Sequence, residues 1–267
     1  MSALTVSELA IYPVKSLGAV ALSRMQFDSF GPAGDRRYIV ADRDGRFVTQ
    51  REYPRMTLIQ VALRGQALEF SAPAMPSFSL AAPCIDNAER REIVVWRDRV
   101  QACDMGDAIA AWLSSYLGTD VRLYFMPDDS VRAVDPHYAR VGDRVGFADG
   151  FPVLLIGAAS LEEFNRALPE PIESLRFRPN IVVAGALPYA EDAWRRVRIG
   201  AIEFDVVKPC SRCVIPSIDP CTAQKQAVVA QTLARLRRRD NAVYFGQNLI
   251  ARDTGEIAIG DEVIVIE

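Results

Sequence analysis

The chain has 267 residues, half of them apolar and about a quarter charged, which is ordinary for a globular protein of one large or two small domains. Its 31 basic and 34 acidic side chains give a net charge of −3, which excludes a strong overall attraction to nucleic acid or to an anionic membrane. The sequence has no apolar run of the roughly 20 residues that a membrane-spanning helix needs, and no secretory signal pattern. We therefore expect a cytoplasmic protein with reduced cysteines, no membrane association and no nucleic-acid partner.

Most segments with a clear pattern are typical of strands, because they alternate apolar and polar side chains or are rich in β-branched and aromatic residues. In chain order they are residues 37–42 and 46–49 around the hairpin signal Asp44-Gly45, residues 93–96, 121–125 and 202–207, and a predicted C-terminal hairpin of residues 256–259 and 262–266.

Helical patterns are fewer. Residues 107–117 have helical apolar spacing and stop at Gly118, a residue typical of a C-cap. Residues 160–168 open with Ser160-x-x-Glu163, which predicts a capping box. Residues 223–239 end in four arginines that would complement a helix dipole or, alternatively, contact a partner.

Few helices among many short strands predict a mainly β fold rather than a doubly wound sheet. Pro- and Ala-rich residues 72–83 and residues 127–146 are expected to be long loops. We place the division between two domains after Gly118, so that the predicted domains are residues 1–118 and 119–267.

The most informative motif of the chain is the cysteine pair Cys210 and Cys213. Arg212 lies between the two cysteines, and Pro209 and Pro216 flank them. Proline restricts the backbone and removes a donor, so both thiols are expected on a loop, where they could react or bind a soft metal. The pair alone leaves three interpretations open: half of a structural zinc site, a dithiol redox site, or inert buried thiols.

Three other segments place cations next to strands. They contain Lys15-Ser16, residues 34–38 with two arginines, and residues 176–180 with two more. Each alone is as typical of solvated or ion-paired surface charge as of a ligand site. If the three converged in the fold, their donors would suit an anionic group such as a phosphate.

Taken together, the motifs resemble the MOSC superfamily, and in particular its members with an N-terminal β-barrel domain, such as the mitochondrial amidoxime-reducing component and bacterial YcbX-like proteins. The resemblance covers nearly the whole chain and rests on motifs in a fixed order. They include residues 11–16, 34–38, 47–51, 149–152, 159–161, 177–182, 189–194, 210–213, 245–248 and 259–261. It implies an N-terminal β-barrel-like domain followed by a MOSC β-barrel domain.

The resemblance also implies a molybdenum cofactor (molybdopterin) and roles for seven residues. Cys213 would ligate the metal, and Asp149 matches an acidic position near it. Contacts to the pterin and its phosphate are implied for Lys15, Ser16, Arg36, Arg178 and Asn180. A thiolate suits molybdenum, and lysine, arginine and hydroxyl donors suit a phosphate.

The function that follows is reduction of N-hydroxylated or N-oxygenated small molecules. No ferredoxin domain follows the MOSC pattern, so we expect separate ferredoxin-, flavin- or cytochrome b5-like electron donors. The alternative is a sulfur carrier that holds a persulfide on Cys210 or Cys213, and a third interpretation is a structural or interaction protein. Pyridoxal phosphate is not expected, because Lys15 is better interpreted as a phosphate contact than as a Schiff-base lysine.

Overall fold

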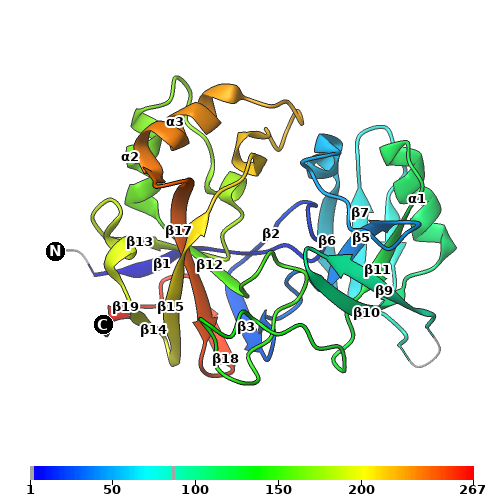
Figure 1. Cartoon of the computed structure of the whole chain (residues 1–267), viewed down its shortest axis with the longest axis horizontal. Coiled ribbons are helices and arrows are strands. Elements are labelled where there is room, and N and C mark those ends of the chain that lie inside the picture. Colours follow the sequence, from blue (N-terminus) through cyan, green and yellow to red (C-terminus); the bar gives the residue numbers. More distant parts are fainter. Residues whose placement is uncertain (1–2, 86–87) are drawn as a thin grey trace.

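The computed structural model describes residues 3–85 and 88–267. Two β-rich halves lie side by side, with the helices on the outside of each half (Figure 1). The mainly β fold expected from the sequence is confirmed.

The larger half is built on a sheet that has nine strands within the described residues. Its neighbouring strands are antiparallel, except that β12 and β13 are parallel and are connected through α2 (Ala158–Arg166). In spatial order the sheet contains β19 (Val263–Val265), β14 (Arg196–Ile199), β15 (Ile202–Ser211), β17 (Ala242–Ala251), β12 (Val153–Gly157), β13 (Ile181–Ala184), β1 (Thr5–Ile11) and β2 (Val20–Leu22), and β16 (Arg238–Arg239) pairs with β17.

The smaller half contains two further sheets and α1 (Asp107–Leu117). One sheet has the order β5 (Tyr38–Asp42), β11 (Val121–Phe125), β10 (Asp98–Asp104) and β9 (Arg90–Val95), and the other has the order β6 (Gln60–Arg64), β7 (Ala67–Ser71) and β8 (Phe78–Leu80). Side chains from α1 pack into a core with both sheets, including Ile109 and Leu113, which are fully buried.

Strand pairs cross the division predicted after Gly118 in both directions. β1 pairs with β13 in the larger half, and β11 pairs with β5 in the smaller half. A small sheet of β18 (Gly255–Ala258), β3 (Arg24–Asp28) and β4 (Gly31–Pro32) likewise joins an early segment to a late one. The hydrogen-bonded sheets therefore join segments from both predicted domains, and the domain division itself stays a prediction.

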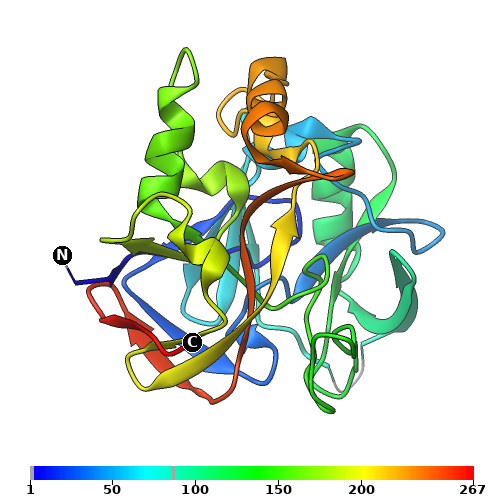
Figure 2. The same ribbon diagram turned by 60° about the vertical axis from the view of Figure 1, so that its left-hand side comes forward.

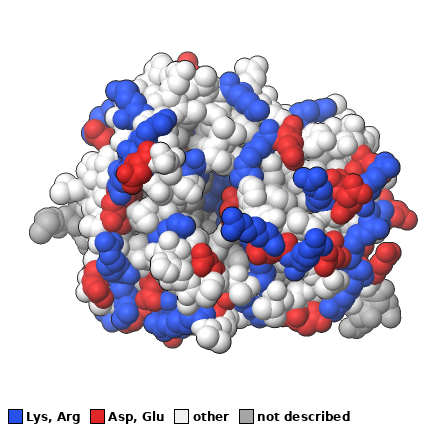
Figure 3. All heavy atoms as spheres, viewed as in Figure 1, with Lys and Arg blue, Asp and Glu red and all other residues white. Residues whose placement is uncertain are grey.

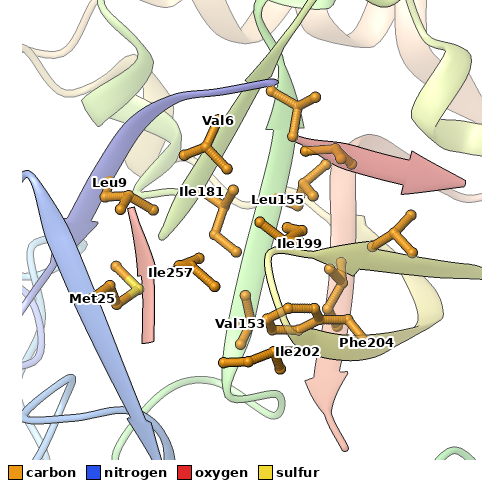
Figure 4. Close-up of a cluster of buried hydrophobic side chains, with 14 of the residues drawn as sticks. Val6, Leu9, Met25, Val153, Leu155, Ile181, Ile199, Ile202, Phe204 and Ile257 are labelled. Atoms are coloured by element: carbon orange, nitrogen blue, oxygen red, sulfur yellow. The ribbon is translucent and has the colours of Figure 1, made fainter. Parts of the chain in front are cut away.

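The core of the larger half fills the space enclosed by its strands (Figure 4). Leu155 of β12, Ile181 of β13 and Phe204 of β15 are fully buried there, and Ile257 of β18 closes the cluster from the small sheet. Burying an aliphatic or aromatic side chain of this kind contributes about 1.5–3 kcal/mol. This core therefore fixes the strands whose ends carry the candidate site.

All three predicted helices are present. The helix predicted at residues 107–117 has those bounds, and the other two differ from their predicted bounds at their ends. Gly118 ends α1 with a left-handed φ of 72°, as the C-cap prediction requires. α2 begins two residues before the predicted start, and α3 (Ala227–Arg237) ends before its last two predicted arginines, which form β16. The helices α2 and α3 lie on the same side of the larger half (Figure 2). No helix within the described residues is long and apolar enough to cross a membrane.

Short one-turn helices connect several strands, among them η1 (Pro54–Leu58), η2 (Ser174–Phe177), η3 (Ala190–Ala193) and η4 (Ile215–Ser217). The predicted capping box is wrong. The N-cap of α2 is Gly157, and the Ser160 hydroxyl donates to Glu191 at 2.8 Å instead of capping its own helix. Burial of Glu191 requires such partners, since an unpaired buried carboxylate is costly.

The predicted C-terminal hairpin is also wrong. β18 pairs with β3 and β19 pairs with β14, so the turn at Gly260-Asp261 separates two strands of different sheets. Two smaller predictions fail as well. Residues 46–49 form only isolated bridges at Arg46 and Phe47, and the expected loop of residues 72–83 contains β8.

Candidate functional site

A cleft between the two halves brings together all the residues that the sequence predicts for the site. It encloses about 770 Å³, including its open side, and both halves contribute to its lining. The predicted residues that line it are Lys15, Ser16, Arg36, Asp149, Arg178, Asn180 and Cys213. Figure 3 shows Lys and Arg atoms gathered in and around a hollow between the halves.

The segment after β1 carries Lys15 and Ser16 from the larger half to the smaller one. Its backbone pairs with the start of β5: Lys15 N–H donates to the Tyr38 carbonyl at 2.9 Å, and Tyr38 N–H donates to the Pro13 carbonyl at 3.0 Å. Ser16 has a φ of 67°, and its carbonyl accepts a bond from Gln50 Nε2 at 2.8 Å. Both site residues are therefore held by bonds to the smaller half.

Two arginines of the cleft lining, Arg36 and Arg178, belong to a buried stack of charged and aromatic groups. The guanidiniums of Arg36 and Arg178 lie 4.2 and 4.1 Å from the centre of the Tyr12 ring. Asp35 balances them, because it accepts a 2.6 Å bond from Arg36 and a 2.8 Å bond from the Tyr12 backbone. We call these four residues, together with Asn180, the inner wall. Cation–π contacts of this kind contribute about 2 kcal/mol when desolvated.

Arg178 keeps an unused donor in the inner wall. Its Nη1 donates to the Leu17 carbonyl at 2.7 Å, whereas its Nη2 is buried and has no hydrogen-bond partner among the described residues. Burial, with the nearby charge of Arg36, lowers the pKa of Arg178 to about 10, so the group remains positive at neutral pH. A buried guanidinium with an unsatisfied donor is expected to bind an anion or acceptor from outside the chain.

Asn180 is a cleft-lining residue whose side-chain amide makes its hydrogen bonds to neighbouring protein groups. Only 2% of its surface is exposed. Its Oδ1 accepts bonds from Arg36 at 3.2 Å and from the Leu154 backbone at 3.1 Å, and its Nδ2 donates to the Ala10 carbonyl at 3.1 Å. Its amide therefore fixes Arg36 and ties β1 to β12, and the ligand contact that the resemblance implies for Asn180 stays a prediction.

The entrance of the cleft has a different composition. Asp149 is paired with Lys15 at 2.6 Å and with Arg51 at 3.4 Å, and its Oδ1 accepts a 3.3 Å bond from Trp96 Nε1. We call Arg51, Trp96, Asp149 and Cys213 the cleft mouth. Although the surrounding protein raises the pKa of Asp149, the charges and hydrogen bonds of its partners, Lys15 first, bring that pKa well below its usual range. Asp149 is therefore ionised at neutral pH.

Lys15 connects Asp149 of the cleft mouth to Phe147, whose N–H donates to the Arg36 carbonyl of the inner wall at 2.6 Å. Lys15 is almost fully buried, and its Nζ donates both to Asp149 and to the Phe147 carbonyl, the latter at 2.8 Å. Burial lowers the pKa of Lys15 to about 8, against the opposing effect of Asp149. Nearby, the buried guanidinium of Arg132 donates to the carbonyls of Ala148 and Asp149, and thereby holds the loop that carries Asp149.

The two thiols of the Cys-Ser-Arg-Cys segment have different surroundings. Cys210 belongs to the end of β15, which corrects the prediction of a loop for that residue, whereas Cys213 follows the strand and is exposed. Arg212 lies 3.0 Å from the Cys210 sulfur, and Arg51 lies 3.6 Å from the Cys213 sulfur. Within residues 3–85 and 88–267 no group of three His, Cys, Asp or Glu side chains is arranged to hold a metal.

Two cleft arginines received no role from the sequence. Arg51 bridges Asp149 and Cys213, and Arg212 lines the cleft with a buried Nε that has no partner among the described residues. Both belong to segments that the sequence singles out, but neither is distinguishable from a surface arginine without the fold. The charged groups that line the described cleft are then Lys15, Arg36, Arg51, Arg178 and Arg212 against Asp149. The cleft is therefore strongly cationic.

Comparison with known proteins identifies the family of the chain. The model of the MOSC N-terminal beta barrel domain matches residues 3–120, and the model of the MOSC domain matches residues 142–264. The chain belongs to the MOSC domain family. Its architecture is an N-terminal MOSC β-barrel domain followed by a MOSC domain, as the sequence motifs predict.

Relatives of similar architecture cover nearly the whole chain. Mitochondrial amidoxime-reducing component 1 is 30% identical in Homo sapiens and 32% identical in Mus musculus. Each match covers 98% of this chain, and 83% and 82% of those proteins respectively. The molybdenum cofactor sulfurase of Homo sapiens is 30% identical over 92% of this chain, but that match covers only 30% of the sulfurase.

Proposed function

We propose that this MOSC protein binds a molybdenum cofactor in the cleft and reduces N-hydroxylated or N-oxygenated small molecules. One observation carries the proposal: a cationic inner wall with an unsatisfied, buried guanidinium nitrogen lies in the same cleft as an exposed cysteine. The similarity to amidoxime-reducing components over nearly the full chain supports the reaction class.

The residues of the cleft fit the chemistry of such a cofactor. Its phosphate and pterin would take donors from Arg178 and Arg212, whose buried Nη2 and Nε have no partner among the described residues, and from Lys15 and Ser16. Arg36 would add charge while Asn180 fixes its position. A thiolate is a suitable soft ligand for molybdenum, and Cys213 is the exposed thiol of the cleft mouth.

When bound, the cofactor would supply two-electron, oxygen-atom-transfer chemistry. Reduction of an N–OH group to N–H releases water and consumes two electrons and two protons. Lys15 holds a proton on Nζ at neutral pH, since its pKa is about 8, and Asp149 orients that ammonium with a 2.6 Å bond. Asp149 is itself ionised and exposed, and would orient a polar or cationic substrate at the cleft mouth.

The electrons would come from separate ferredoxin-, flavin- or cytochrome b5-like proteins. The small-molecule substrate would enter from the open side of the cleft. A cytoplasmic location is part of the same proposal and rests on the sequence alone.

Expression in a bacterial host that makes molybdenum cofactor tests the proposal directly. The purified protein should carry near-stoichiometric molybdenum and release a fluorescent pterin after oxidation. It should also reduce an N-hydroxylated amidine when given a chemical or protein electron donor. Protein from a matched host that cannot make the cofactor is the control. Metal-free, pterin-free protein from the competent host would overturn the proposal.

A sulfur carrier is the second candidate, and the surroundings of the thiols favour it specifically. Both Cys210 and Cys213 have a guanidinium within 3.6 Å of sulfur, which would stabilise an anionic persulfide. The match to part of a molybdenum cofactor sulfurase supports this candidate too. Mass spectrometry after incubation with a cysteine desulfurase separates the two functions: a labile added sulfur on cofactor-free protein favours the carrier, and unmodified protein excludes it.

A further inference from the structure

Trp96 has a backbone conformation that is unusual for a bulky side chain. β9 ends at Val95 and β10 begins at Asp98, so Trp96 and Arg97 form a two-residue hairpin connection. Trp96 has a φ of 58°, whereas favoured hairpin turns place glycine or asparagine at positions with positive φ. A bulky residue in this region is strained, and such strain is concentrated at functional sites.

Three contacts hold the Trp96 ring at the cleft mouth. Its Nε1 donates to Asp149 Oδ1 at 3.3 Å, the guanidinium of Arg51 lies 4.9 Å from the ring centre, and Phe47 packs edge-on at 5.1 Å. Even so, 49% of the Trp96 surface remains exposed. The indole is therefore oriented by polar contacts while a large aromatic surface stays open to solvent.

A second cavity lies beside the cofactor cleft, and Trp96 lines it together with Phe47, Tyr53 and Val94. Thr49 and Arg51 line both cavities, so the two are contiguous at the cleft mouth. The second cavity encloses about 1380 Å³ including its open side, which is ample for a small ring system. Its lining combines these apolar side chains with the charged groups of Asp42, Arg46, Arg51 and Glu52, and small-molecule sites likewise join apolar walls to polar groups that orient the ligand.

We propose that Trp96 and this second cavity form a subsite for the planar aromatic part of the substrate. The inference rests on the proposed reductase function and adds a specificity-determining residue to it, because Trp96 would favour substrates with an aromatic ring over aliphatic ones. The ring would pack against the exposed indole while the N–OH group extends past Arg51 into the cofactor cleft. Aromatic pairs prefer such offset or edge-to-face packing and gain free energy beyond the burial of their area.

The test compares Trp96→Gly with Arg97→Ala, a change in the same turn that leaves the indole in place. Both variants and the molybdenum-loaded wild type are assayed with the N-hydroxylated forms of benzamidine and acetamidine. Trp96→Gly should raise the ratio of the aromatic KM to the aliphatic KM about tenfold relative to the wild type. Because glycine relieves the positive φ, its urea midpoint should not fall. Arg97→Ala should match the wild type, and Trp96→Phe should recover most of the affinity.

The outcomes separate the subsite from the proposed function. Loaded, active protein in which Trp96→Gly leaves the aromatic KM unchanged, or raises both KM values equally, would overturn the subsite and leave the reductase intact. Protein without molybdenum or activity would overturn the reductase. In that case calorimetric titration with benzamidine decides the subsite: weaker binding by Trp96→Gly than by Arg97→Ala supports it, and equal or no binding excludes it.

Discussion

The inner wall and the cleft mouth share one cleft but are built in opposite ways. In the inner wall, Asp35 and Asn180 are nearly fully buried, and each makes several bonds that fix the guanidiniums. In the cleft mouth, Asp149, Trp96 and Cys213 are exposed. A rigid, desolvated cationic surface is suited to retaining one anionic group, whereas an open rim is suited to a ligand that exchanges. We therefore infer that the inner wall would hold the pterin and phosphate of the cofactor, and that the cleft mouth would supply the metal ligand and meet the substrate.

Loss of Asp35 should affect the inner wall most. The Asp35→Ala variant leaves the buried charges of Arg36 and Arg178 without a counter-ion, and breaking a buried pair in this way costs about 3–5 kcal/mol. Urea unfolding should show this fall in the free energy of unfolding. The control is Glu163→Ala, which removes an exposed pair with Arg166 and should cost under about 0.5 kcal/mol. Equal effects of the two variants would contradict a rigid, charge-balanced inner wall.

Lys15, which joins the two regions, should give the protein a distinctive pH dependence. Its pKa is about 8 in the folded protein against 10.5 normally, so the unfolded chain binds more protons between these values. The contribution of Lys15 to the free energy of unfolding should therefore rise with pH from about 8 to 10.5, by up to about 3 kcal/mol.

The measurement is the difference in unfolding free energy between wild type and Lys15→Met over that range. Lys225→Met, at an exposed lysine, supplies the control. A flat difference for Lys15→Met would show that Lys15 is not desolvated, and would remove the link between the two regions.

Alanine substitutions at two glycines near Asp149 test how tightly the two regions are packed, because each adds only one methyl group. A Cβ at Gly146 would lie 2.8 Å from the Arg36 carbonyl oxygen, whereas a Cβ at Gly150 would meet nothing within 4 Å. Gly146→Ala should therefore cost about 1–3 kcal/mol by displacing the backbone of the inner wall. Gly150→Ala should stay within about 0.5 kcal/mol of wild type in urea unfolding. If Gly146→Ala were equally neutral, the inner wall would be more plastic than its contacts indicate.

The sequence predicts the members of the site better than their arrangement. The order of motifs identifies the residues from Lys15 to Cys213 that the fold brings into one cleft. The sequence predicts no functional role for Trp96, because the apolar residues before it indicate the end of a strand. The two-residue turn that follows β9 places its indole against Asp149. The sequence predicts no role for Arg51 or Arg212 either, because the role of a guanidinium depends on the groups that the fold places around it.

Long-range pairing accounts for the errors in the fold. The Gly260-Asp261 turn is a correct local signal, but β18 and β19 find partners in β3 and β14, more than fifty residues away in sequence. Likewise, the Ser160 hydroxyl bonds to Glu191 because that buried carboxylate needs donors. Local patterns therefore locate turns and helices in this chain, while tertiary contacts decide what those elements join.

Cys213→Ala most directly tests the central claim that the cleft mouth ligates metal while the inner wall retains the cofactor. The variant should be made in a cofactor-producing host and compared with Cys221→Ala, which removes an exposed thiol outside the cleft lining. The ratio of molybdenum to pterin and the reductase activity should be measured together. We predict that Cys213→Ala keeps its fold and its pterin but loses molybdenum or activity, while Cys221→Ala retains all of them. A Cys213→Ala protein with full molybdenum and full activity would contradict the account.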